Sequence, residues 1–280
     1  MPSMKSIKRR ISSVKTTRKI MKAMNMVAAS KLQRNKNRLE KAEPFAQESR
    51  RILKIIQECE VKDNIFFQRR EEGNSAYLVI TNDRGLCGNY NSNLTEKTLQ
   101  HIEAGRSEML IIAGVKGYEY FKRRDKKIIE RFDDVAETAF YEDAQRMADF
   151  LLSLYSSGAV KEAFLCYTEF ESVLSSNALV ERILPIELKP AENRNKYNKM
   201  KYEPDVDVFL QAAIPRYISS AIYLAFLQSS ASEQAARMLS MDTAVNNASD
   251  IISNLTSTYN RRRQAAITQE ISEIIGNTNV

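Results

Sequence analysis

Apolar and small side chains recur every three or four residues along the first stretch of the chain, residues 4 to 57. That interval places them on one side of an α-helix, as in a heptad seam. Pro44 interrupts the pattern, and we expect it to kink the helix rather than end it. At 1.5 Å per residue the helix is about 80 Å long. Its predicted seam consists of Ile7, Ile11, Val14, Met21, Ala28, Leu32, Leu39, Ala42, Ala46, Leu53 and Ile56.

A second stretch with the same spacing covers residues 205 to 275. Pro215 predicts a boundary between a short lead-in helix and the main helix, and Gly276 predicts a C-terminal stop. The main seam consists of Ile214, Tyr217, Ala221, Leu224, Ala231, Ala235, Met238, Val245, Ile252 and Tyr259. Near its end the seam shifts phase, as in a stutter, to Ile267, Ile271 and Ile274.

Both stretches carry an apolar stripe, and helices of this kind are not stable alone in water. We therefore expect them to pair as a long antiparallel coiled coil. The second helix is the longer one, so its last turns should extend beside the start of the first helix and past it. The chain has only 8 Gly and 6 Pro, which also favours long elements with few turns.

The middle of the chain alternates between strand and helix patterns. Strands are predicted at 76–81, 109–113, 163–167 and 178–188, and helices at 114–123 and 143–155. The alternation predicts an inserted, Rossmann-like α/β domain with a mostly parallel sheet. The polar stretch 189–204 is predicted to be a mobile loop. The predicted organisation is an N-terminal helix in 1–60, an α/β foot domain in 70–200 and a C-terminal helix in 205–280.

Several classes of function lack the residues they need. No run of eighteen apolar residues is present, so no membrane-spanning segment is predicted. The basic start, residues 1 to 10, leads directly into patterned helix, and we expect neither a secretory signal nor a transit peptide. The cysteines Cys59, Cys87 and Cys166 have no zinc-site spacing and suit a reducing compartment. With His101 as the single histidine and no catalytic set, we expect neither enzyme activity, nor a metal, nor a cofactor.

Basic residues dominate positions 5 to 41, where Glu40 is the single acid, and the net charge of the chain is +7. A merely soluble surface mixes signs, so this basic stretch favours an acidic partner. One alternative is a basic coiled-coil protein that binds nucleic acid. No aromatic residue precedes Phe45, which leaves no stacking platform for single strands, although a duplex could be held through its phosphates.

Two short segments invite a functional interpretation. The cluster Met21, Met24, Met26, Val27, Ala28 and Ala29 covers more than one face of a helix, so some of its side chains must point away from the seam. Residues 83–88 read Asp-Arg-Gly-Leu-Cys-Gly after a predicted strand. Their glycine spacing fits neither a dinucleotide fingerprint nor a P-loop, which favours a structural turn.

Four segments together closely resemble the gamma subunit of F-type ATP synthases: residues 20–31, 83–88, 232–241 and 259–270. The resemblance spans essentially the whole chain and favours a bacterial member. It implies a central stalk that rotates inside a ring of alternating alpha and beta subunits. Its foot would sit with the epsilon subunit on the membrane c-ring, and ion flow would drive ATP synthesis at the beta subunits. The chain would be a peripheral, non-catalytic subunit at the cytoplasmic face of the cell membrane, without nucleic acid and touching the membrane only through its partners.

The resemblance also implies roles for individual residues. Met24, Arg237, Gln264 and Thr268 match positions at which the shaft meets the beta subunits, and Arg263 is their neighbour. Arg84 and Cys87 match the loop that lies near an acidic lever of beta. Asn89 stands where the family often has a second glycine, which predicts a different bend of that loop. The dithiol insert of the plastid form is missing, which argues against thiol switching.

Overall fold

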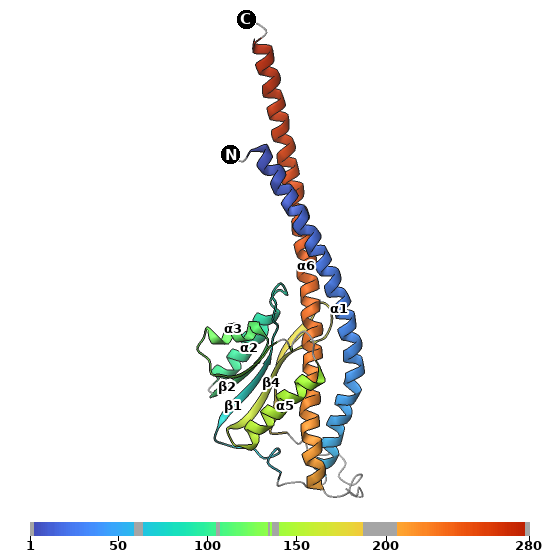
Figure 1. Cartoon of the computed structure of the whole chain (residues 1–280), viewed down its shortest axis with the longest axis vertical. Helices are drawn as coiled ribbons and strands as arrows, with labels where there is room; N and C mark the ends of the chain where they lie inside the picture. The colour runs from blue at the N-terminus through green and yellow to red at the C-terminus, as the bar shows by residue number, and fades with distance from the viewer. Residues whose placement is uncertain are drawn as a thin grey trace. The chain divides into compact units, whose positions relative to one another are not determined.

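A long helix lies at each end of the described part of the chain. The computed structural model describes residues 3–58, 64–104, 107–133, 135, 140–186 and 206–277. Helix α1 spans Met4–Glu58 and helix α6 spans Val206–Asn277 (Figure 1). The chain divides into a smaller unit, Met1–Ala29 with Arg237–Val280, and a larger unit, Ser30–Ala236. The predicted loop 189–204 and Cys59 lie outside the described residues.

Pro44 and Pro215 both lie inside helices. Pro44 does not end α1, as expected, but the predicted boundary at Pro215 is wrong, because α6 runs through it without a break. A proline in a helix interior costs about 3 kcal/mol. Leu210, Ile214 and Ile218, on both sides of Pro215, are almost completely buried. At about 1.5–3 kcal/mol each, their burial outweighs that cost.

Helix α6 includes Gly276 and is described to Asn277, one residue beyond the predicted stop. Helix ends fray, and their limits are defined only to within about one or two residues. The predicted stop therefore agrees with the described helix within that uncertainty.

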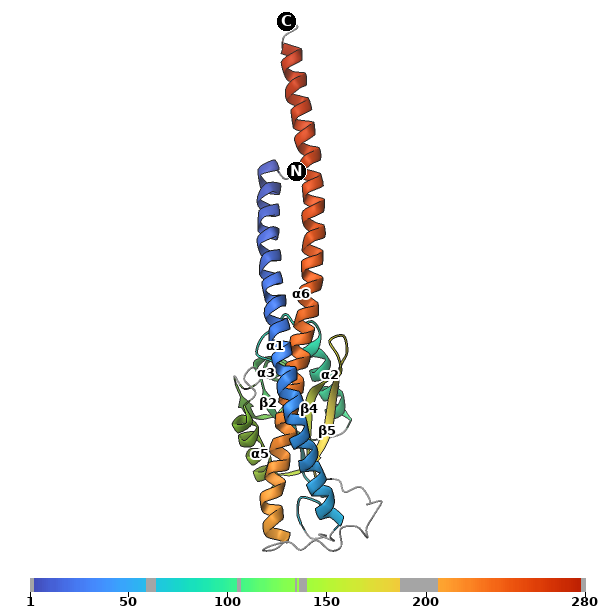
Figure 2. The same cartoon turned by 90° about the vertical axis from the view of Figure 1, so that its right-hand side faces the viewer.

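In the smaller unit, α1 and α6 run antiparallel and side by side (Figure 2). The Asn25 side chain donates a hydrogen bond to the carbonyl of Met238 (2.9 Å), and Arg18 donates one to the hydroxyl of Ser249 (3.2 Å). The seam positions Ile7 and Ala28 are buried. On α6 the buried residues of this unit are Met241 and Ala248, which the predicted seam did not include, whereas the predicted Met238 and Val245 are only half-buried. The side chains of Leu53, Ile56 and Ile274 lie outside the described residues.

The larger unit contains a five-stranded sheet in the order β3-β2-β1-β4-β5. Neighbours among the first four strands are parallel, and β5 is antiparallel to β4. The strands are β1 Asn74–Ile80, β2 Glu108–Ala113, β3 Ile128–Phe132, β4 Val160–Phe170 and β5 Ser176–Leu184. This unit also contains the helices α2 Tyr90–Glu103, α3 Val115–Lys122 and α5 Tyr141–Ser156. The mostly parallel sheet was predicted, whereas α2 and β3 were not.

The predicted last strand, 178–188, runs too far. Strand β5 ends at Leu184, directly before Pro185. Proline has no backbone N–H to donate, so it ends a sheet ladder readily. Ile186, which follows this proline, is buried, and its backbone N–H donates to the carbonyl of Phe66 (2.8 Å) outside the sheet.

Helices cover both faces of the sheet. One face packs against α5 and α6, where Leu151, Tyr155 and Phe226 are buried. The other face packs against α2 and α3, where Leu94 and Phe121 are buried (Figure 1). A sheet covered on both sides explains why β1 reads as a continuous apolar run instead of an alternating one.

Candidate partner-contact surfaces

The end of α6 in the smaller unit extends past the start of α1 (Figures 1 and 2). Continuing the antiparallel register set by Arg18 and Asn25, Met4 lies beside about residue 261 of α6. The last turns of α6 therefore have no α1 residue to pack against. This outcome agrees with the predicted difference in length between the two helices.

The predicted seam positions Ile267 and Ile271 are not packed in a seam. Their side chains are 46% and 51% exposed, because α1 does not reach this part of α6. Gln264, Ile267, Thr268 and Ile271 follow the spacing i, i+3, i+4, i+7, which places them on one face of the helix. This tip face combines two apolar side chains with two of the polar residues predicted to contact a partner. The apolar half of the surface was missed because its spacing was assigned to the seam.

The predicted contact residues of the smaller unit differ in exposure. Arg263, Gln264 and Thr268 are exposed, and the Thr268 hydroxyl donates to the carbonyl of Gln264 (2.9 Å). Met24 and Arg237 are half-buried. The exposed residues can meet a partner directly, whereas the half-buried ones offer only part of their surface.

The Met-Ala cluster divides between the two sides of α1, as its spacing predicted. Ala28 is buried in the smaller unit, while Met26 and Val27 are 64% and 55% exposed. Ile20 is 56% exposed as well, beside the exposed lysines Lys19 and Lys22. Together they form a surface with apolar and positively charged side chains, and flexible methionines suit a partner surface that changes shape.

In the larger unit, residues 81–89 connect β1 to α2 through hydrogen bonds of their own. The Asn91 side chain accepts from the backbone N–H of Asn82 (3.1 Å) and donates to the Cys87 sulfur (3.5 Å). Asp83 accepts from the N–H of Val115 at the start of α3 (3.0 Å). These side chains thus hold the loop and the start of α3 in place, which agrees with a structural turn.

The loop turns one predicted contact residue outward and the other inward. Arg84 is exposed, whereas Cys87 is 2% exposed. Leu86 is 64% exposed and has a left-handed backbone (φ 65°). The loop therefore presents an apolar side chain beside Arg84, and the buried Cys87 supports it from inside. Sequence reasoning did not single out Leu86.

The backbone at Asn89 does not need a glycine. Its φ of −88° is open to any residue, and the positive φ falls on Gly88 instead (57°). A second glycine is therefore not required for this conformation.

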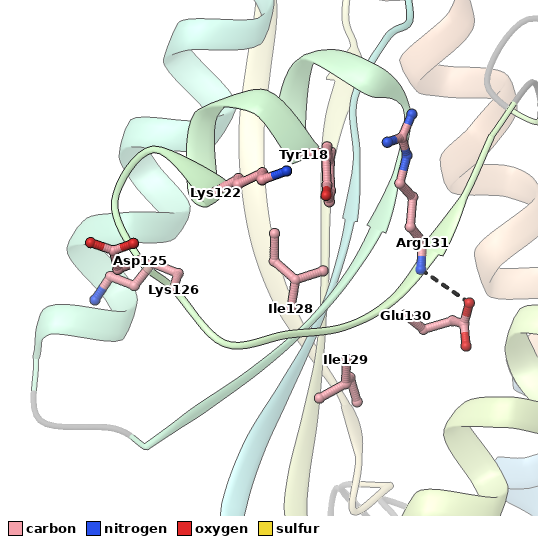
Figure 3. A pocket seen from close by; sticks show the side chains of 8 residues that line it. All are labelled: Tyr118, Lys122, Asp125, Lys126, Ile128, Ile129, Glu130 and Arg131. Atoms are coloured by element: carbon pink, nitrogen blue, oxygen red, sulfur yellow. Dashed lines mark hydrogen bonds between the residues drawn. The ribbon is translucent and has the colours of Figure 1, made fainter.

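A surface hollow of about 580 Å³ lies at the β3 edge of the sheet (Figure 3). The Arg131 guanidinium lies 4.2 Å from the centre of the Tyr118 ring, and its Nε donates to Asp133 (2.6 Å). The Arg131 N–H donates to the carboxylate of Glu130 (3.1 Å), the bond drawn in Figure 3. Cations and carboxylates neutralise one another here, as is common on edge strands that avoid pairing with other chains.

The described residues offer no group of three or more His, Cys, Asp or Glu side chains that could hold a metal ion. His101 is half-buried in the larger unit, where its Nδ1 lies 3.0 Å from the Tyr77 hydroxyl and its ring meets that of Phe164 edge-on. Within the described ranges, no helix is both long and apolar enough to cross a membrane. The surfaces that stand out are therefore the tip face, the outward side of α1 and the loop 83–88.

A solved structure that shares this fold contains the central stalk of an ATP synthase. The chain is similar to a chain of the mitochondrial ATP synthase of Tetrahymena thermophila, in a structure of its central stalk and c-ring, with a TM-score of 0.64, 27% identity, and 80% of this chain and 99% of that chain covered. It also shares the fold of a chain in the OSCP/F1/c-ring structure of the Euglena gracilis mitochondrial ATP synthase. The TM-score is 0.69 at 17% identity, and the match covers 99% of this chain and 93% of that chain. The fold therefore defines a central-stalk protein.

Sequence comparison narrows this class to one family. A family model described as ATP synthase matches residues 3–279. The chain is 37% identical over 284 residues to the ATP synthase gamma chain of Heliobacterium modesticaldum, covering 99% of this chain and 98% of the relative. It is 38% identical over 283 residues to the gamma chain of Anaeromyxobacter sp., covering 98% of each. The chain belongs to the ATP synthase gamma chain family, the central-stalk subunits of ATP synthases.

Proposed function

We propose that this chain rotates as the shaft of an ATP synthase and couples ion flow through a membrane ring to ATP synthesis or hydrolysis at the beta subunits. In this proposal residues 1–60 and 205–280 form an antiparallel coiled-coil shaft, and residues 70–200 form a Rossmann-like foot. The subunit is non-catalytic and binds no cofactor. Each orientation of an asymmetric shaft stabilises one beta conformation over the others, which is coupling in the thermodynamic sense.

The observation that carries this proposal is the exposed tip face of α6. Gln264, Ile267, Thr268 and Ile271 lie on one side of a helix that extends past its partner α1. An exposed face of this composition, in a chain of the gamma family, supports contact with a surrounding sleeve of beta subunits. We assign Arg263 and the half-buried Met24 and Arg237 to the same contact.

The second contact in our proposal is the loop of the foot. Arg84 and the exposed Leu86 meet the acidic lever of a beta subunit, while Cys87 holds the loop from inside. The basic stretch of α1 supports this arrangement, because a positive shaft inside acidic levers is attracted at long range without being locked in one orientation.

The foot contacts the epsilon subunit and the c-ring in this proposal, and the alpha and beta subunits surround the shaft. One structure with this fold contains a central stalk with its c-ring, and another contains OSCP, F1 and the c-ring, which supports these partners. The chain lies at the cytoplasmic face of a bacterial membrane as a peripheral subunit and touches the lipid only through its partners. We expect no nucleic-acid partner.

Copurification tests the proposal at the level of the complex. A tagged chain expressed as the only copy in its cell should bring down alpha, beta, epsilon and c subunits from solubilised membranes, in one complex that hydrolyses ATP. Tight duplex DNA binding that falls steeply with salt, without alpha and beta subunits, would instead support the nucleic-acid alternative.

A further inference from the structure

A second hollow, of about 570 Å³, lies in the larger unit between α1, α6 and the first residue of α5. It shares no residue with the tip face or the loop 83–88, whereas its Arg38 and Lys41 lie at the end of the basic stretch of α1. Helix α1 contributes Arg38, Lys41 and Phe45, which follow the spacing i, i+3, i+7 on one face. Helix α6 contributes Arg216 and Tyr223, also seven residues apart, and α5 contributes Tyr141.

The aromatic rings give this hollow an apolar floor. Tyr141 and Tyr223 meet edge-on, with 5.6 Å between ring centroids, so each ring limits the movement of the other. Phe45 lines the same hollow and is 53% exposed, so the three rings together leave apolar surface open to solvent. Pre-positioned aromatic rings are the usual anchors of protein interfaces.

The charges around these rings have one sign. Arg38, Lys41 and Arg216 line the hollow, and the described residues that line it include no carboxylate. The hollow at the β3 edge differs in this respect, because Asp125 and Glu130 line it together with its cations. Cations around exposed rings complement a surface that combines carboxylates with apolar side chains.

We infer that this hollow binds an acidic amphipathic helix of a partner protein. Its floor lies between two helices, α1 and α6, and an amphipathic helix is the segment that lays an apolar face into such a groove. Leucine-type side chains of the partner would cover Phe45 and Tyr223. Its carboxylates, one turn away, would pair with Lys41 and Arg216 at the rim.

Photo-crosslinking tests this inference in the assembled complex. Phe45 is replaced by p-benzoylphenylalanine in the full chain, membranes are irradiated, and the cross-linked peptide is sequenced. The expected product joins this chain to a partner segment with apolar residues at helical spacing and at least two Asp or Glu residues on the adjoining face. The same photoprobe at Leu174, which is 83% exposed and lies outside the hollow, is the matched control and should not capture that segment.

Charge reversal tests the role of the cations. Lys41→Glu with Arg216→Glu should lower the yield of the Phe45 cross-link by about tenfold. Arg51→Glu, at an exposed arginine of α1 outside the hollow, should leave the yield unchanged. Replacing the captured carboxylates by lysine should restore the cross-link to the doubly reversed chain.

The inference is overturned if the Phe45 probe captures only lipid or this chain itself, if it captures a segment without carboxylates, or if it captures nothing while the chain is present in the complex. It is also overturned if charge reversal leaves the yield unchanged. Absence of the chain from the complex would instead contradict the proposed function.

Discussion

Two single residues of the larger unit show how its core constrains side chains: Thr81 is fixed by hydrogen bonds, and Cys166 is an ionisable group that is completely buried. Thr81 bonds to both the carbonyl of Ala113 and the N–H of Gly117, each at 2.9 Å, and so joins the ends of β1, β2 and α3. Cys166 is completely buried on β4 beside Val79 of β1. Both sites make predictions that concern one side chain each.

Gly114→Ala should destabilise the chain by about 2–4 kcal/mol. Gly114 has φ 97°, and a Cβ there would lie 2.3 Å from the carbonyl oxygen of Thr81. Backbone strain and steric overlap therefore add. Urea unfolding followed by circular dichroism measures the loss. Gly85→Ala is the control, since a Cβ at Gly85 meets nothing within 4 Å, and its effect should stay within about 0.5 kcal/mol.

The stability of the foot should fall as the pH rises above 9. Burial raises the pKa of the Cys166 thiol from its ordinary value of 9.0 to about 12. The folded state therefore keeps this proton where the unfolded state loses it, and stability is full below about pH 9 and declines toward pH 12. Burial also raises the pKa of Tyr90 and Tyr167, which add to the decline above pH 10.

Cys166→Ala should flatten the slope of unfolding free energy between pH 9 and 10 by about 1 kcal/mol per pH unit. Val79→Ala truncates the neighbouring core position without removing an ionisable group, so it should lower stability at all pH values and keep the slope. Equal slopes for both variants would contradict the assignment.

At the scale of elements, the periodic spacing of apolar residues predicted the helices and strands whose formation depends on local sequence. The long helices, the strands β1, β2 and β4 and the helix α5 follow from it. The break at Pro215 was wrong because burial of its neighbours, which depends on tertiary structure, outweighs the local cost of proline. Strand β3 was missed because it is an edge strand with Glu130 and Arg131 at its centre.

Helix α2 was missed because its buried face includes threonines. Thr95 and Thr98 are buried, and each hydroxyl bonds to a carbonyl four residues earlier, at 3.0 and 2.8 Å. A threonine that satisfies its hydroxyl within its own helix can be buried like an apolar residue. Among the proposed contacts, the positions came from the resemblance, whereas the exposure of Ile267, Ile271 and Leu86 needed the structure.

Two hydrogen bonds connect strand β4 to helix α6, and we predict that removing them lowers the stability of the chain. The backbone N–H of Thr168 at the end of β4 donates to the Ser229 hydroxyl (3.2 Å), and Ser232 donates to the Thr168 carbonyl (3.3 Å). Ser229→Ala with Ser232→Ala leaves both buried backbone groups unpaired and should cost about 2–5 kcal/mol.

Ser219→Ala is the control for the removal of these two hydrogen bonds. Ser219 is equally buried on α6, but its hydroxyl bonds within the helix to the carbonyl of Pro215 (2.8 Å). Its loss should cost no more than about 1 kcal/mol in thermal or urea unfolding. Equal losses in the two variants would show that Thr168 does not depend on the serines.

At the scale of the whole molecule, the function rests on surfaces that the chain itself leaves uncovered. The tip face has apolar side chains with no α1 residue beside them, and the basic stretch of α1 has a single acid. A protein that worked alone would gain stability by burying the apolar side chains of the tip face. It would also gain by placing acidic residues among the cations of the basic stretch. Their coexistence in a gamma-family chain supports a shaft whose partners provide the complementary surfaces.

The most direct test of this account is ion-gradient-driven ATP synthesis in membrane vesicles whose ATP synthase contains the chain cut before Gln264. The shortened chain loses the tip face but keeps the residues of α6 that pack against α1. We predict that the shortened chain assembles in normal amount and that the rate of synthesis falls on the order of tenfold, the loss expected from about 1.4 kcal/mol of coupling free energy. Synthesis at the full rate by assembled complexes with the shortened chain would contradict the account.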